Sequence, residues 1–270
     1  MLALGIYREA QFSPGKVDAD AAILDRALAS LAEAGIETVA VRPDTHDRYP
    51  TGDIDLVLAM CQGERQLERL ASFEKSGALV INSALAIRNC YRDLLGAGLM
   101  RAGVPAPRGL VIDLATGERD VTGLDSARGL YVKRGDLHAL GPDDVQRVDG
   151  PAALQEALES FARRAVRRVY IQQAVSGTLV KFYGVSGGEY FAALPEYGAL
   201  ARSLELALRQ AAERAAAALG LEVWGGDAIV SGEDLTIVDF NDWPSFSRVC
   251  DAAGPAIARR ARSLLCRRDR

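Results

Sequence analysis

The first third of the chain alternates short apolar runs with segments whose apolar side chains recur at helical spacing. Four apolar runs have the length of buried strands, at residues 2–7, 37–41, 55–60 and 78–81. Between them, apolar residues three or four positions apart predict two helices, at residues 18–34 and 64–76. Strands that alternate with helices are typical of a parallel sheet covered by helices. We therefore expect a small parallel α/β domain at residues 1–88.

Beyond residue 89 the strands follow one another more closely and are expected to form hairpins. Residues 82–102 are predicted to form one helix, which ends before Pro105 and Pro107 because proline lacks an amide donor. Predicted strands cover residues 109–113, 130–133, 168–173, 178–184, 189–193, 222–230 and 234–240. Predicted helices cover residues 151–165, 199–219 and 253–267. The second part of the chain is therefore expected to be of the α+β type.

The last predicted hairpin carries the most informative polar residues. Asp239 and Asn241 are two positions apart, so their side chains share one face of the strand. Asp227 on the preceding strand can point to the same side. Two carboxylates and an amide oxygen suit Mg²⁺ (or Mn²⁺), which completes its coordination with water and phosphate oxygens. Because each acid interrupts an apolar strand, the pattern favours a metal site over surface acids.

The spacing Asp227…Asp239-x-Asn241-x-x-Pro244 on a hairpin resembles the metal-binding end of the ATP-grasp superfamily. The resemblance covers about residues 82–260 and extends to the order of the segments along the chain. It implies a Rossmann-like pre-ATP-grasp domain at 1–88 and an ATP-grasp domain at 89–270. The ATP-grasp domain would have two lobes, at about 89–173 and 174–270, with ATP bound between them.

The resemblance also implies which residues bind the nucleotide. Lys133 and Lys181 stand on strands whose lysines reach the phosphates, where they would neutralise charge and orient the γ-phosphate, Lys181 with a catalytic role. Arg92 replaces the lysine that family members usually carry. The loop 135–141 has only two glycines, fewer than a typical phosphate-covering loop. The linker between the lobes, whose backbone meets adenine in the family, is predicted to contribute Gln172, Gln173, Ala174 and Val175.

A second substrate is expected near the loop that follows the first strand. In parallel α/β domains, ligands bind beyond the carboxyl ends of the strands. Residues 8–16 form a longer connection than the usual two to six residues, and Arg8 and Lys16 in it are predicted to contact the acceptor. Arg248 is predicted to bind a carboxylate or phosphate across the cleft, with a catalytic role. The alternatives, a surface loop and a surface arginine, stay open.

Composition restricts the function classes. The chain of 270 residues has a formal net charge of −4, which argues against a dedicated nucleic-acid-binding protein. No apolar run approaches the roughly 18 residues that span a bilayer, and no basic leader precedes an apolar segment. The four cysteines form no C-x-x-C pair. We expect a cytoplasmic protein with reduced thiols and a small-molecule substrate, without nucleic-acid or membrane partners; a homodimer stays open.

Three functions agree with the resemblance. Ribosomal-protein glutamate ligases and glutathione synthetases are similar members, which implies amide formation through an acylphosphate. Inositol polyphosphate kinases are also similar, because Asp239 stands where ligases usually carry glutamate and Lys181 begins a similar Lys-Phe-Tyr-Gly stretch. A polyphosphate substrate would require more basic residues than Arg8 and Lys16, so the ligase is favoured. The third function is nucleotide binding without turnover.

Overall fold

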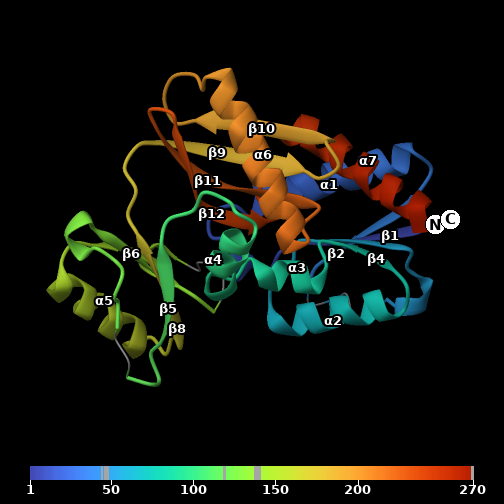
Figure 1. Ribbon diagram of the computed structural model, residues 1–270. Helices are drawn as coiled ribbons and strands as arrows, with labels where there is room; N and C mark the ends of the chain where they lie inside the picture. The colour runs from blue at the N-terminus through green and yellow to red at the C-terminus, as the bar shows by residue number, and fades with distance from the viewer. Residues whose placement is uncertain (44, 46–48, 118–119, 137–140, 269–270) are drawn as a thin grey trace.

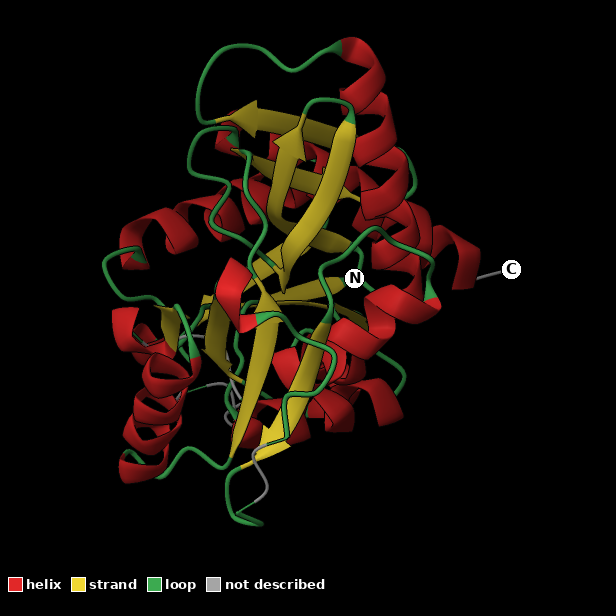
Figure 2. Cartoon of the chain, turned by 60° about the vertical axis from the view of Figure 1, so that its left-hand side comes forward, coloured by secondary structure: helices red, strands yellow, loops and turns green. Residues whose placement is uncertain are grey.

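The computed structural model describes residues 1–43, 45, 49–117, 120–136 and 141–268. In these residues the framework consists of three four-stranded sheets. Their strands lie in the middle of the molecule, with the helices mainly around the outside (Figure 2). The expected mixture of a parallel N-terminal sheet and later antiparallel sheets is confirmed.

The first sheet is parallel and has the strand order β2-β1-β3-β4. Its strands are β1 (Leu2–Ile6), β2 (Glu37–Val41), β3 (Leu56–Ala59) and β4 (Leu79–Ile81). The helices α1 (Val17–Glu33) and α2 (Glu64–Lys75) cover opposite faces, because successive strand side chains point to opposite sides. Leu56 and Leu58 pack toward α1, whereas Val57 and Ala59 pack toward α2.

The predicted single helix at residues 82–102 is wrong, because the structure has two helices there. These are α3 (Ala84–Asn89) and α4 (Arg92–Arg101). Tyr91 between them has extended backbone angles, and its buried side chain donates a hydrogen bond to the Gln62 carbonyl at 3.0 Å. This tertiary contact places Arg92 at the first residue of a new helix.

The second sheet has the strand order β5-β8-β6-β7. Its strands are β5 (Gly109–Asp113), β6 (Leu130–Arg134), β7 (Val145–Val148) and β8 (Arg168–Gln173). The edge strand β7 was not predicted, because its short Val-Gln-Arg-Val sequence has no distinctive period. The helix α5 (Pro151–Arg163) covers one face with Leu154, Leu158 and Phe161.

The third sheet is antiparallel, with the order β10-β9-β11-β12. Its strands are β9 (Thr178–Val185), β10 (Tyr190–Pro195), β11 (Val223–Ser231) and β12 (Asp234–Asp242). One face carries a cluster of aromatic rings, Phe182, Trp224 and Phe240. The helix α6 (Arg202–Leu219) covers this cluster with small alanine side chains. On the other face, Tyr183, Val185 and Val223 are buried in a second core cluster.

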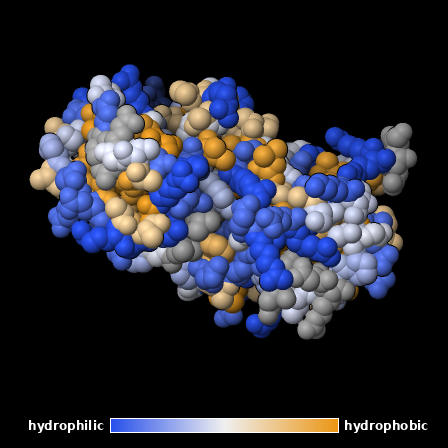
Figure 3. All heavy atoms as spheres, turned by 90° about the horizontal axis from the view of Figure 1, so that it is seen from below, coloured by the Kyte–Doolittle hydropathy of each residue, from blue (hydrophilic) through white to orange (hydrophobic). Residues whose placement is uncertain are grey.

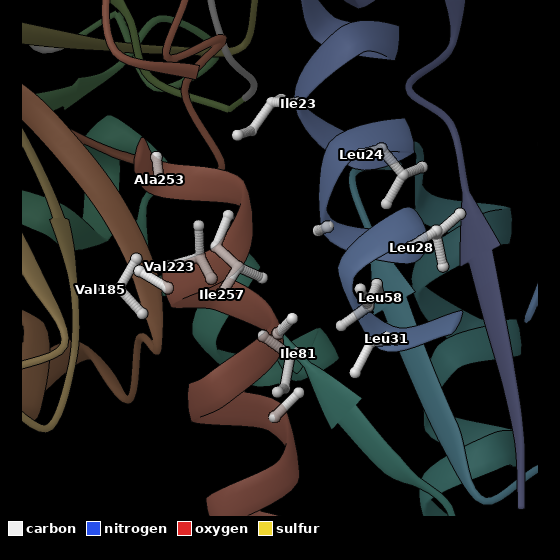
Figure 4. Packing of buried hydrophobic residues seen from close by; sticks show 14 of the residues in the cluster. Ile23, Leu24, Leu28, Leu31, Leu58, Ile81, Val185, Val223, Ala253 and Ile257 are labelled. Carbon is white, nitrogen blue, oxygen red and sulfur yellow. The ribbon is translucent and has the colours of Figure 1, made fainter. Parts of the chain in front are cut away.

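The first and third sheets share one hydrophobic core. The C-terminal helix α7 (Cys250–Arg268) packs against α1 (Figures 1 and 4), and Ile257 lies near Val185, Val223 and Ile81. Asn82 is fully buried between the two sheets and donates a hydrogen bond to the Val223 carbonyl at 2.7 Å. The first domain and the C-terminal lobe are therefore held together as one packed unit.

Hydrophilic side chains cover most of the face that Figure 3 shows, with apolar side chains in patches between them. Among the residues that the structure describes, none of the helices combines the length and the apolar character needed to cross a membrane.

Candidate functional site

A row of charged side chains crosses the open face of the third sheet. Lys181 on β9 pairs in register with Asp227 on β11, which pairs in turn with Asp239 on β12. Register partners point to the same face of a sheet, and Asn241 lies two residues beyond Asp239. The sequence predicted that Asp227, Asp239 and Asn241 share one face, and the register agrees.

A β-bulge lies where the lobe at residues 89–173 contacts this row. The register shifts between Asp227 and Ala228, so Val238 on β12 has no partner residue on β11. The Val238 carbonyl accepts hydrogen bonds from Lys133 Nζ at 3.1 Å and Gln172 Nε2 at 3.2 Å. Lys133 and Gln172 come from the second sheet, so this carbonyl joins the two lobes at the predicted nucleotide cleft.

Each of the two acids in the row is paired with a cation. Lys181 Nζ lies 2.8 Å from Asp227 Oδ1, and Arg92 Nη2 lies 3.1 Å from Asp239 Oδ2. Burial lowers the pKa of Lys181, but the hydrogen bond and charge of Asp227 outweigh it, and the pKa is raised. Burial lowers the pKa of Lys133, which the charge of Asp239 only partly offsets. Lys133 therefore holds its proton less firmly than an exposed lysine does.

The donor set fits a Mg²⁺ ion. Asp227, Asp239 and Asn241 are hard oxygen donors on one face, and Mg²⁺ usually takes only one or two protein carboxylates. In the described part of the chain, no group of three or more His, Cys, Asp or Glu side chains is placed to hold a metal. A metal bound here would thus depend on the amide oxygen of Asn241 and on ligand oxygens.

A cleft of about 620 Å³ lies over this face of the sheet. Several residues predicted from the sequence line it: Arg8, Lys16, Arg92, Lys181, Asp227, Asn241 and Arg248. A smaller cavity beside it is lined by further predicted residues, Lys133, Gln172 and Asp239, and again by Arg92. Residues from the loop after β1, from α4 and from the second and third sheets thus meet at adjoining cavities.

Of the four predicted linker contacts, Gln172 lines the smaller cavity, whereas Gln173, Ala174 and Val175 line neither cavity. The Gln173 side chain donates to the carbonyls of Asp125 and Gly129 at 3.0 and 2.9 Å. The backbone amide of Ala174 donates to Gly129 at 3.0 Å, and Val175 lines neither cavity. Residues 137–140 of the predicted phosphate-covering loop lie outside the described residues.

The chain after β12 folds back over the third sheet. A Cβ atom at Gly225 would lie 2.7 Å from Pro244 Cγ, so glycine is required for this close approach. The buried Trp243 ring is held by a hydrogen bond from its Nε1 to the Ile81 carbonyl at 3.1 Å. This fold-back places Arg248 in the wall of the cleft.

Arg8 and Lys16 differ in their surroundings. Arg8 forms an ion pair with Asp20 at 3.3 Å and donates a hydrogen bond to the Trp243 carbonyl. It therefore ties the loop after β1 to the loop that carries Arg248. Lys16 and Arg248 are exposed in the cleft, and neither has an ion-pair partner among the described residues.

Replacing Lys16 by alanine is expected to raise the KM for the acceptor roughly ten- to a hundredfold, while the KM for ATP changes little. A charge-assisted contact contributes about 1.5–3 kcal/mol, and Lys16 lines the large cleft but not the smaller cavity that contains Lys133 and Asp239. Steady-state kinetics with each substrate varied in turn measures both constants. Lys75→Ala, at an exposed position on α2, is the matched control; equal changes in both constants for Lys16→Ala would exclude a specific acceptor contact.

The structure adds cleft residues that the sequence did not indicate. Asp242 is fully buried and accepts a hydrogen bond from Gln62 Nε2 at 3.1 Å. Tyr183 and Glu196 also line the cleft. Tyr183 could have been found from its position two residues after Lys181 on one strand face, whereas Gln62 and Glu196 lie in loops without a motif.

No protein-family model and no curated protein matches the sequence. Solved structures match over nearly the whole chain. A D-alanine–D-alanine ligase from Bacillus anthracis, crystallised with ATP, has a TM-score of 0.74 and 15% identity, covering 99% of this chain and 98% of that one. A D-cycloserine synthetase has a TM-score of 0.69 and 17% identity, covering 98% and 100%. A RimK-domain ATP-grasp protein from Sphaerobacter thermophilus has a TM-score of 0.66 and 18% identity, covering 96% and 99%. Similarity at these identities establishes the fold, and the chain therefore has the ATP-grasp fold that its sequence predicted.

Proposed function

We propose that this protein is an ATP-dependent ligase that uses Mg²⁺ and joins a small-molecule carboxylate to an amine. The observation that carries the proposal is the row Lys181, Asp227 and Asp239 on the open face of the third sheet, beside the cleft. The named ligase and synthetase with the same fold support the same reaction class.

The cleft offers separate places for the nucleotide and the acceptor. Arg92, Lys133 and Lys181 surround the acids and would bind the phosphates, since fixed cations neutralise phosphate charge without reorganisation. A bound Mg²⁺ would shield the phosphate oxygens and help to orient them. Lys16 and Arg248, which line the large cleft but not the smaller cavity, would bind the acceptor.

The proposed reaction has two steps. A carboxylate oxygen of the acceptor attacks the γ-phosphorus, the bond to the bridging oxygen breaks, and ADP leaves with that electron pair. The amine then attacks the carbonyl carbon of the acylphosphate, phosphate leaves, and the nitrogen loses a proton. The protein contributes by positioning and by charge neutralisation, so no protein nucleophile is required.

The mixed charge of the cleft favours this reaction over phosphorylation of a polyphosphate. Glu196 and the buried Asp242 line the cleft together with its cations. Acidic side chains would repel a highly anionic substrate, whereas they can accept the ammonium group of an amino-acid-like one.

Product analysis tests the reaction class. The protein is incubated with Mg–ATP and with pooled amino acids or pooled polyols, and ADP, free phosphate and adducts are quantified. The ligase predicts equal amounts of ADP, free phosphate and an amide. ADP with a phosphorylated alcohol would instead identify a kinase, and bound ATP without turnover would identify a nucleotide-binding protein.

A further inference from the structure

Gln62 is a buried amide in the wall of the large cleft, with an exposed fraction of 1%. Its backbone amide donates to Glu9 Oε2 at 3.0 Å, and its backbone carbonyl accepts from the Tyr91 hydroxyl at 3.0 Å. Its side-chain Nε2 donates to Asp242 Oδ1 at 3.1 Å. Its Oε1 is buried and has no hydrogen-bond partner among the described residues. Because an unpaired buried acceptor is costly, this oxygen indicates a ligand that supplies a donor.

The position of Gln62 in the fold is that of a ligand-binding residue. Gln62 follows β3, and β1 and β3 are the two central strands of the parallel sheet. In such domains ligands bind beyond the carboxyl ends of the strands. Glu9 joins the loops after β1 and β3, because its two carboxylate oxygens accept from the backbone amides of Gln62 and Gly63 at 3.0 and 2.8 Å. Asp242 directly follows Asn241, so this part of the cleft adjoins the proposed metal site.

The charges around the unpaired oxygen favour a cationic donor. Burial raises the pKa of the neighbouring Cys61 thiol, and the charges of Glu9 and Asp242 raise it further. Arg8 acts in the opposite direction, but it is paired with Asp20 at 3.3 Å. An ammonium group has three donors and no acceptor. It therefore suits an amide oxygen between carboxylates better than a neutral hydroxyl does.

We propose that Gln62 Oε1 accepts a hydrogen bond from the protonated amino group of the carboxylate substrate, and that this substrate is an amino acid. The inference rests on the proposed ligase function. The charge of Asp242 stabilises the same ammonium group. In an amino acid the ammonium and the carboxylate are close together, which suits a subsite beside the metal. A carboxylic acid without an amino group would leave Oε1 unpaired.

The first test compares amino acids with carboxylic acids that lack only the amino group, such as alanine with propionate and glutamate with glutarate. Hydroxylamine replaces the second substrate: its nitrogen attacks the acylphosphate carbonyl, phosphate leaves, and the nitrogen loses a proton to give a hydroxamate. With Mg–ATP, the parent protein is expected to use an amino acid with a kcat/KM roughly ten- to a hundredfold above that of its counterpart. Equal values for the two members of a reacting pair would overturn the inference.

Gln62→Met tests the contact itself, because methionine has a similar length but is only a weak acceptor. The kcat/KM for the amino acid is expected to fall roughly ten- to a hundredfold, while that for its counterpart and the KM for ATP stay unchanged. A merely structural role would lower the values for both acids alike. Gln62→Asn, which withdraws the amide by one methylene, gives the same comparison if the methionine variant does not fold. Gln210→Met, at an exposed position on α6, is the matched control.

The outcomes separate this inference from the ligase proposal. A folded Gln62→Met that kept the parent's preference for the amino acid would overturn the inference and leave the ligase proposal standing. Hydroxamate formed only from acids without an amino group would do the same. Absence of hydroxamate with every carboxylate would overturn both.

Discussion

Replacing Asp239 by asparagine is expected to lower the rate of ADP formation by on the order of a thousandfold. The metal–phosphate contact that Asp239 would support contributes several kcal/mol to transition-state stabilisation, and each 1.4 kcal/mol is about tenfold in rate. The fold should persist, because Asp239 lies at the wall of a cavity and an asparagine oxygen can still accept the hydrogen bond from Arg92. Initial rates of ADP release and the thermal unfolding midpoint measure the two effects.

Asp234→Asn is the matched control for this change. Asp234 lies on the same strand, β12, but at its exposed start beside the turn, away from both cavities. It should leave the rate unchanged. If Asp239→Asn released ADP at the parent rate, the assignment of a metal to the β11–β12 hairpin would have to be abandoned.

The sequence was sufficient to predict part of this hairpin. Period-two alternation is a local signal, and it assigns Asp239 and Asn241 on one strand to the same face. Asp227 pairs with Asp239 only because the register shifts between Asp227 and Ala228, so the sequence could show only that it can point to the same side. The strands and helices of the first domain could be predicted for the same reason, because each element has a local pattern of apolar residues.

Contacts between distant segments could not be predicted in the same way. Val238 has no partner residue on β11 only because the register between β11 and β12 shifts, and no residue type in the sequence indicates a bulge at this position. Arg92 and Asp239 are 147 positions apart, so their pairing depends on how α4 packs beside the third sheet. Arg8 was expected to contact the acceptor and does line the cleft, but the sequence did not indicate that it also pairs with Asp20 and with the Trp243 carbonyl and so holds two loops together.

Because of such long-range contacts, replacing Lys133 is expected to change nucleotide affinity without lowering the stability of the fold. Its ammonium group is buried and shares the Val238 carbonyl with Gln172 Nε2, so loss of the lysine leaves that carbonyl with a donor. Lys133→Met removes a buried charge and replaces it with an apolar chain of similar length. The free energy of unfolding should therefore be unchanged or higher, although a cation for the phosphates is lost.

Lys133→Met is expected to weaken ATP binding roughly ten- to a hundredfold, as a charge-assisted contact of about 1.5–3 kcal/mol predicts. Because burial lowers the pKa of Lys133, the affinity of the parent protein should also fall as the pH rises through that lowered pKa, where the lysine loses its charge. The methionine variant should show no such fall. Calorimetric titration with ATP across the alkaline range measures both effects, with Lys75→Met on exposed α2 as the control. If a folded Lys133→Met bound ATP as tightly as the parent, β6 would not contribute to the phosphate site. If its affinity and its stability both fell, the role of the lysine would be to join the two lobes.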